Sequence, residues 1–274
     1  MFRRPQRSGS ILCPSCGRLV GVNDEVCLNC GRRNPGMWGL TSVLGKLGRQ
    51  DLGFEKAVIG GSVLLYLLML VVTPGFGLGG GMGPASLLAP SQEAMLRFGA
   101  SGAIPVLGHG RWWTLLSAGW LHAGILHILF NVMWVRQLAP QTAELYGASR
   151  MVILYTVSSV CGFLASTLLM TPITLGASAP IFGLLGALVC YGRRAGSSAI
   201  GQQAWTYAII LFAFGFIFRG VDNWAHLGGF VGGYLTALVL DPRKGERPGH
   251  TILAIGCLAA TALSILASLV VPLR

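Results

Sequence analysis

Residues 151–192 read MVILYTVSSVCGFLASTLLMTPITLGASAPIFGLLGALVCYG, a stretch that contains no Asp, Glu, Lys or Arg. A membrane-crossing helix needs about 20 apolar residues, so this stretch is too long for a single crossing. Its middle part, TPITLG at 171–176, combines a proline with a glycine, and both residues are typical of turns. We therefore expect two membrane helices here, separated by a turn that precedes Ser178.

The composition of the whole chain indicates an integral membrane protein. Of its 274 residues, 53% are hydrophobic and only 11% are charged, whereas soluble domains carry about 25% charged residues. A soluble globular protein is therefore excluded. Charge-poor stretches predict seven membrane helices, near residues 57–73, 115–138, 151–170, 178–193, 205–218, 223–240 and 251–271. The predicted fold class is an all-α polytopic membrane protein.

The net charge of +11 is explained by membrane topology rather than by a nucleic-acid partner. If the tail before the first span is cytoplasmic, the short loops on that side carry seven Lys and Arg residues, against four on the outer side. Membrane proteins carry such an excess in their cytoplasmic loops. We therefore expect a cytoplasmic N-terminus, and the lipid bilayer rather than nucleic acid as the surroundings of the chain.

Five polar side chains are predicted to lie at one membrane depth. In the orientation above, the second, fourth and sixth spans run inward, and their outer halves contain His122, His127, Asn131, Ser178 and His226. Polar groups within a span are costly and usually face the protein interior, so these residues can meet in one cavity open to the outside. His127 and Asn131, four residues apart, share a helix face. His122, five residues before His127, is expected to point away from it.

Ser178 and His226 have the chemistry of a nucleophile and its base. A serine hydroxyl needs a base within hydrogen-bond reach, and imidazole is such a base near neutral pH. Small residues four apart let two membrane helices approach closely, which would bring His226 to Ser178. The small residues are Ala179, Gly183 and Ala187 on the fourth span and Gly229, Gly233 and Ala237 on the sixth. An oxyanion would find donors in the Ser178 backbone N–H, free at a helix start, and in His127 and Asn131.

Three motifs occur in order along the chain: HAGILHILFN at 122–131, GASA at 176–179 and AHLGGFVGG at 225–233. They resemble the His-x4-His-x3-Asn, Gly-x-Ser-Gly and Ala-His-x2-Gly-x3-Gly motifs of the rhomboid intramembrane serine proteases. The resemblance covers about residues 57–240 and implies a six-helix rhomboid core, followed here by a seventh helix. It also implies a Ser178–His226 dyad, oxyanion stabilisation by His127 and Asn131, and a structural His122.

The resemblance implies a bacterial inner-membrane enzyme that cleaves transmembrane proteins near the outer face and needs no catalytic cofactor. The chain departs from the family pattern at Ala179, where glycine is usual, and at Phe182, where some members have tyrosine; Phe182 can still stack on His226. The family's Glu-x-Trp-Arg is replaced by RWWT at 111–114. An alternative function is therefore a rhomboid-like protein that binds membrane clients without cutting them.

Two further interpretations concern single residues of this region. Asp222, four residues before His226, can orient that histidine, although the N-cap of a helix is the role that its position favours. A zinc peptidase is disfavoured, because the helical zinc motif His-Glu-x-x-His places its histidines four residues apart with a glutamate between them. His122 and His127 are five residues apart, and no acidic residue lies between them.

The N-terminal tail carries a separate metal-binding signal. Two Cys-x2-Cys pairs with ten residues between them are typical of a tetrahedral zinc site, formed by Cys13, Cys16, Cys27 and Cys30. Four ligands with no open position predict a structural zinc. We expect a zinc ribbon with a short basic tail at 1–34, a linker at 35–56, the membrane core at 57–240, and a cytosolic loop with the seventh helix at 241–274. The ribbon is expected to bind a cytosolic partner or to steady the first span.

Overall fold

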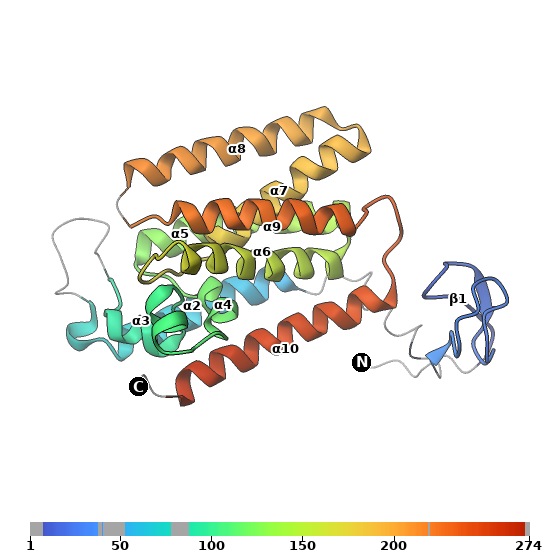
Figure 1. Ribbon diagram of the computed structural model, residues 1–274, viewed down its shortest axis with the longest axis horizontal. Helices are drawn as coiled ribbons and strands as arrows, with labels where there is room; N and C mark the ends of the chain where they lie inside the picture. Colours follow the sequence, from blue (N-terminus) through green and yellow to red (C-terminus); the bar gives the residue numbers. More distant parts are fainter. Residues whose placement is uncertain (1–7, 38–39, 41–52, 78–87, 219, 272–274) are drawn as a thin grey trace.

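The chain folds into a bundle of long helices and a small N-terminal β module (Figure 1). The computed structural model describes residues 8–37, 40, 53–77, 88–218 and 220–271. Most of the predicted linker at 35–56 lies outside the described residues, as do the basic residues Arg219 and Arg274. In the β module, β1 (Ser10–Leu12) pairs antiparallel with β2 (Leu19–Gly21).

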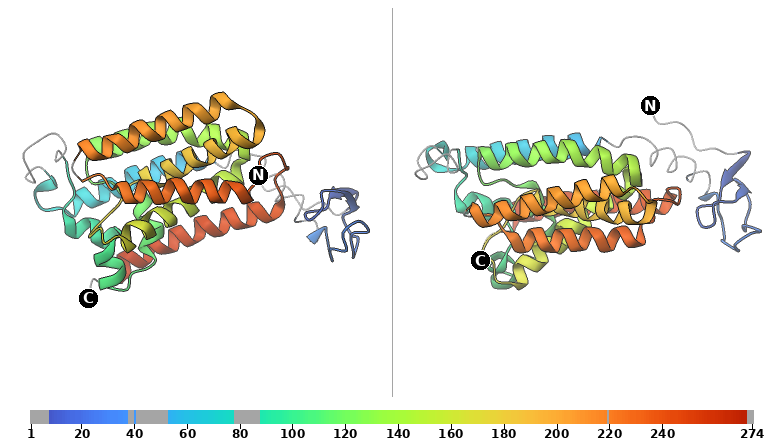
Figure 2. Two further views of the ribbon diagram at one scale, coloured as in Figure 1. Left: turned by 45° about the horizontal axis from the view of Figure 1, so that its top comes forward. Right: turned by 90° about the horizontal axis from the view of Figure 1, so that it is seen from above.

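Seven helices of 17 or more residues make up the bundle within the described ranges. They are α2 (Phe54–Val71), α5 (Ile125–Tyr146), α6 (Ala148–Leu168), α7 (Ser178–Ala195), α8 (Ser198–Ile217), α9 (Asn223–Val239) and α10 (Pro248–Val270). The long helices run roughly side by side (Figure 2). The predicted all-α fold is confirmed, and each predicted span overlaps one of these helices.

Four helices, namely α2, α6, α8 and α10, are long and apolar enough to cross a membrane. A bent pair, Thr114–Trp120 with Ile125–Tyr146, raises this number to five. The other two long helices, α7 and α9, are not among these candidates. Helix α7 is buried along almost its whole length and ends in two arginines, while α9 has 17 residues and is rich in glycine.

The predicted second span at 115–138 is not one continuous helix, which corrects the sequence-based expectation. A short helix, α4 (Thr114–Ser117), continues into a 3₁₀ turn that ends at Trp120, and α5 begins only at Ile125. The two parts meet at an angle of 93°. Gly124, which precedes α5, has an extended backbone, and glycine is a weak helix former. The break places His122 outside any helix.

Helices α7 and α9 touch through their backbones. A Cβ atom added to Gly229 would overlap the carbonyl oxygen of Ala179, and one added to Gly233 would overlap that of Gly183. Such contacts are possible only because small residues face each other along both helices. The predicted ridges of small residues therefore form the contact that holds the fourth and sixth spans together.

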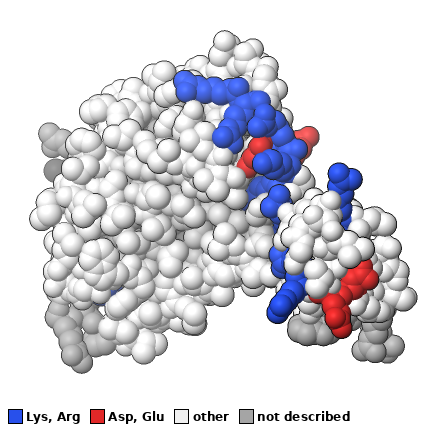
Figure 3. Space-filling view, turned by 45° about the vertical axis from the view of Figure 1, so that its right-hand side comes forward, with Lys and Arg blue, Asp and Glu red and all other residues white. Residues whose placement is uncertain are grey.

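Basic residues gather at one end of the bundle (Figure 3). Arg193 and Arg194 lie in the last turn of α7, and Arg243, Lys244 and Arg247 lie between α9 and α10. The N-terminal ends of α5, α7 and α9 lie at the opposite end, beside the short helix α3 (Gln92–Phe98) and α4 (Figure 1). The candidate site is therefore remote from the basic end.

Candidate functional site

Ser178 is the first residue of α7, and the turn before it strongly favours glycine. Gly176 has a φ of +127°, in the range that residues with a side chain rarely adopt. A Cβ atom on Gly176 would lie 2.7 Å from His127 Nε2 and 3.7 Å from Ser178 Oγ. The Gly176 N–H donates to Ala118 O at 2.9 Å. Ser178 and His127 therefore flank the same glycine, and Ser178 remains half-buried.

His226 lies in the first turn of α9 and is only 5% exposed. Its imidazole ring stacks on Phe182 with 4.2 Å between the ring centroids and an interplanar angle of 15°. Phe182 is four residues after Ser178, one turn further along α7. The expected stacking is confirmed, and it holds the imidazole against the helix that begins with Ser178.

Asp222 is the N-cap of α9, which confirms the role that its position favoured. One of its carboxylate oxygens, Oδ1, accepts the backbone N–H groups of Trp224 and Ala225 at 3.0 and 3.1 Å. The other, Oδ2, accepts a hydrogen bond from the Ser166 hydroxyl. Within the described part of the chain, His226 Nδ1 has no hydrogen-bond partner. Asp222 therefore caps the helix and does not complete a triad.

His127 directs a hydrogen-bond donor toward Gly176, two residues before Ser178. Its Nδ1 accepts the Ala123 N–H at 3.2 Å, so a neutral imidazole carries its proton on Nε2, the atom that faces Gly176. Asn131, 3% exposed, donates from Nδ2 to His127 O at 2.9 Å. An amide nitrogen has two hydrogens, so the other Asn131 hydrogen stays available.

His122 does not point away from His127, so that expectation was wrong. The two rings lie 5.1 Å apart, edge to face, and His122 is 1% exposed. The expectation assumed that both residues belong to one helix, but α5 begins at Ile125 and His122 precedes the break. The chain therefore folds His122 back onto His127, as a packing partner of that ring.

The structure thus brings Ser178, His226 and His127 together at the beginnings of α7, α9 and α5, with Asn131 one turn beyond His127. Among the described residues, no hydrogen bond joins Ser178 Oγ to His226, although both residues lie at the α7–α9 backbone contact. Sites without substrate often hold their catalytic groups beyond hydrogen-bond distance. The arrangement offers a hydroxyl, an imidazole and several N–H donors around one position, as acyl transfer needs.

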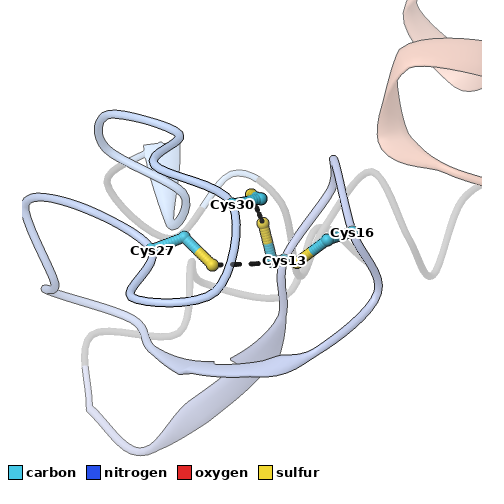
Figure 4. Close-up of side chains that lie close together, drawn as sticks. All are labelled: Cys13, Cys16, Cys27 and Cys30. Atoms are coloured by element: carbon cyan, nitrogen blue, oxygen red, sulfur yellow. Dashed lines mark hydrogen bonds between the residues drawn. The ribbon is translucent and has the colours of Figure 1, made fainter.

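The four N-terminal cysteines form a compact cluster in the β module, with their side chains pointing toward one another (Figure 4). Their sulfur atoms all lie within 4.8 Å of one another, and no disulfide links them. Cys13 and Cys30 are 3.7 Å apart, as are Cys16 and Cys27. Four thiols in this geometry can bind a metal ion, which confirms the expected metal-binding cluster.

The backbone around the cysteines is shaped for ligation. Gly17 and Gly31 have φ values of +73° and +71°, and they donate to Cys13 O and Cys27 O at 2.8 Å. A backbone hydrogen bond at Arg18 lowers the pKa of the Cys16 thiol to about 6. A backbone hydrogen bond at Arg32 lowers the pKa of Cys30, but desolvation and the neighbouring thiols together raise it to about 12. Because the thiolate is the metal-binding form of cysteine, four thiolates at this spacing need a bound cation to balance their charge.

The sequence is similar to known proteins of one family. Residues 109–243 match the family model of the Rhomboid domain. The chain is 32% identical to "Rhomboid protease GluP" of Bacillus subtilis (strain 168), with 64% of this chain and 35% of that protein covered. It is 32% identical to "RHOMBOID-like protein 7" of Arabidopsis thaliana, covering 56% of this chain and 51% of that protein.

A third relative, "Putative rhomboid protease YdcA" of Bacillus subtilis (strain 168), is 32% identical, with 52% of this chain and 73% of that protein covered. The chain spans about a third of GluP and half of RHOMBOID-like protein 7. The region that matches the Rhomboid domain contains Ser178, His226, His127 and Asn131, whereas α2, α10 and the cysteine cluster lie outside it. The chain therefore belongs to the rhomboid family, whose members are generally intramembrane serine proteases, and it is an integral membrane protein.

Proposed function

We propose that this protein is an intramembrane serine endopeptidase in which Ser178 is the nucleophile and His226 the base. The observation that carries the proposal is the stacking of His226 on Phe182, one turn after Ser178. This contact holds an imidazole against the helix start that presents the hydroxyl. The backbone contact between α7 and α9 supports the same pairing.

In this mechanism His226 accepts the Ser178 proton while Oγ attacks the scissile carbonyl carbon. The oxyanion that forms is stabilised by the Ser178 backbone N–H, by His127 Nε2–H and by the second Asn131 amide hydrogen. The protonated His226 then donates to the leaving amine, and the peptide bond breaks. In the second half, His226 activates a water molecule that hydrolyses the acyl ester and releases Ser178.

The substrates are transmembrane proteins, and cleavage takes place near the outer membrane face. The distribution of charge along the bundle supports this orientation, because Arg193, Arg194, Arg243, Lys244 and Arg247 lie at the end remote from the site, whereas the described basic residues near the site are Arg97 and Arg111. Basic loops stay on the cytoplasmic side, so in this proposal the N-terminus is cytoplasmic and the site faces outward. The bacterial inner membrane remains the predicted location.

The cysteine cluster holds a structural zinc ion in this proposal. Thiolates are ligands that zinc prefers, and four of them leave no open coordination position for catalysis. Zinc would thus fix the fold of the β module without taking part in proteolysis. Binding of a cytosolic partner by this module remains a prediction from the sequence.

Cleavage of a model transmembrane substrate in liposomes tests the dyad. Ser178→Ala and His226→Ala should both abolish cleavage while remaining folded. Ser198→Ala is the matched control, because Ser198 is also the first residue of a helix but is exposed at the start of α8. Cleavage that survives in Ser178→Ala would refute the mechanism. A parent protein that neither cleaves nor reacts with a fluorophosphonate probe would favour the client-binding alternative.

A further inference from the structure

The C-terminal part of α10 contacts the segment that we call loop 1, residues 99–120, through serines in an otherwise apolar helix. Ser264 and Ser268 are 3% and 1% exposed and lie one turn apart. The Ser264 hydroxyl donates to Trp113 O at 2.5 Å, and Trp113 Nε1 donates to Ser268 Oγ at 3.0 Å. Two successive turns of α10 therefore hold the same residue of loop 1.

Arg111 makes a second connection between loop 1 and α10. Its side chain is 1% exposed, and it donates from Nη1 to Leu96 O at 2.7 Å and from Nη2 to Ser268 O at 2.8 Å. Leu96 and Ser268 lie in the last turns of α3 and α10, where carbonyl groups carry the negative end of the helix dipole. Leu96 O also accepts the Gly99 N–H at 3.2 Å. No carboxylate pairs with Arg111 in the described part of the chain. The buried cation is therefore balanced by two helix ends.

The other side of loop 1 is bonded to the turn that precedes Ser178. Ser101 and Thr174 exchange two backbone hydrogen bonds, of 2.9 and 2.8 Å. Ala103 N donates to Thr171 O at 2.8 Å. Further along, Gly176 N donates to Ala118 O at 2.9 Å, two residues before Ser178. Loop 1 thus connects the end of α10 to the backbone that places the nucleophile.

We propose that α10 supports the active site and that Arg111 is a positioning residue, which fixes loop 1 and through it the Ser178 turn. This inference rests on the proposed protease function. Ser178 uses its hydroxyl and its backbone N–H in the same step, so a displaced turn misplaces both. A misplacement of about 1 Å can lower a rate by about 100-fold. The effect would fall on the chemical step more than on substrate binding.

The test replaces Arg111 by methionine, which keeps the length of the side chain and removes its five donors. The matched control is Arg97→Met, because Arg97 is an exposed arginine on α3 that carries the same charge. The rate of Ser178 labelling by a fluorophosphonate probe, and kcat and KM for a transmembrane substrate, are measured at a temperature where each variant is folded. We expect Arg111→Met to lower the labelling rate and kcat together by about 10- to 100-fold, with KM nearly unchanged.

A conservative variant separates positioning from a general loss of structure. Lysine keeps the charge but lacks the planar fork that reaches two carbonyls, so Arg111→Lys should recover only part of the labelling rate. If Arg111→Met does not fold, the double variant Trp113→Phe with Ser264→Ala tests the inference instead. It removes two hydrogen-bond donors from the contact between loop 1 and α10 and leaves Arg111 in place. That variant should also be labelled more slowly than Arg97→Met.

The inference would be overturned if folded Arg111→Met showed the labelling rate and kcat of the parent. If Arg111→Met does not fold, the same result in the folded double variant would overturn it. Either outcome would leave the proposed protease function intact. A rise in KM alone, with the rate of Ser178 labelling unchanged, would overturn the inference as well. A parent protein that is not labelled at Ser178 would instead remove the proposed function, and the inference with it. These results are distinguishable because probe labelling needs no transmembrane substrate.

Discussion

Gly176→Ala should damage the site for two reasons that can be read from the structure. The φ of +127° at this position is rarely adopted by residues with a side chain, and such strain costs about 1–3 kcal/mol. The added methyl group would also lie 2.7 Å from His127 Nε2 and 2.8 Å from Cε1, closer than two non-bonded atoms can approach. The imidazole ring must therefore move away from the oxyanion position.

The expected size of the effect follows from the role proposed for His127. Removal of one oxyanion donor lowers kcat by about 100- to 1000-fold, so we expect a fall in kcat of this order together with a lower melting temperature. Substrate cleavage and fluorophosphonate labelling measure the first effect, and thermal unfolding in detergent measures the second.

Gly60→Ala is the matched control for this substitution. Gly60 lies in α2, where an added Cβ meets no atom within 4 Å, and alanine is the better helix former by about 1 kcal/mol. This variant should be as active as the parent and no less stable. If Gly176→Ala cleaved its substrate at the parent rate, the assignment of His127 to the oxyanion would be refuted.

Three further changes have defined outcomes. Gly233→Ala should destabilise the bundle by about 1–3 kcal/mol, because its Cβ would overlap Gly183 O, whereas Gly256→Ala enters open space and should not; thermal unfolding compares them. Purified protein should contain one zinc ion per chain by elemental analysis, and Cys13→Ser should lose it. Burial raises the pKa of Glu246, so the folded state favours its protonated form and the associated stability is lost as pH rises. Glu246→Gln should therefore raise the melting temperature at neutral pH, and the gain should shrink as pH falls through the raised pKa of Glu246 and vanish below the carboxyl pKa of the unfolded chain.

Local sequence patterns predicted most of the long helices and the cysteine cluster, because these features depend on residues that are close together in the sequence. Charge-poor stretches located six of the seven long helices and part of α5, and the small-residue ridges predicted the α7–α9 contact that supports the Ser178–His226 pairing. The spacing of the cysteines predicted a cluster that the structure confirms. The roles of Ser178, His226, His127 and Asn131 remain predictions that the geometry supports.

The parts that sequence patterns missed depend on contacts between distant residues. A periodic pattern could not reveal the break before Ile125, and so the position of His122 was wrong. The pairing of Ser101 with Thr174 uses backbone atoms, which any residue supplies. The contact between α10 and loop 1 did have a sequence signal, namely the serines Ser264 and Ser268 one turn apart in the seventh span. A polar stripe on an apolar helix indicates a buried polar contact.

The glycine contact between α7 and α9 has a consequence for how the protein responds to its surroundings. Main-chain atoms meet at Ala179–Gly229 and at Gly183–Gly233, so the distance between the two helices is set by atomic radii rather than by adjustable rotamers. A thinner or thicker bilayer changes helix tilt, but this pair must tilt as one rigid body. The spacing of Ser178 and His226 should then survive transfer between detergents and lipids, and differences in activity between such environments would originate in the more exposed peripheral helices.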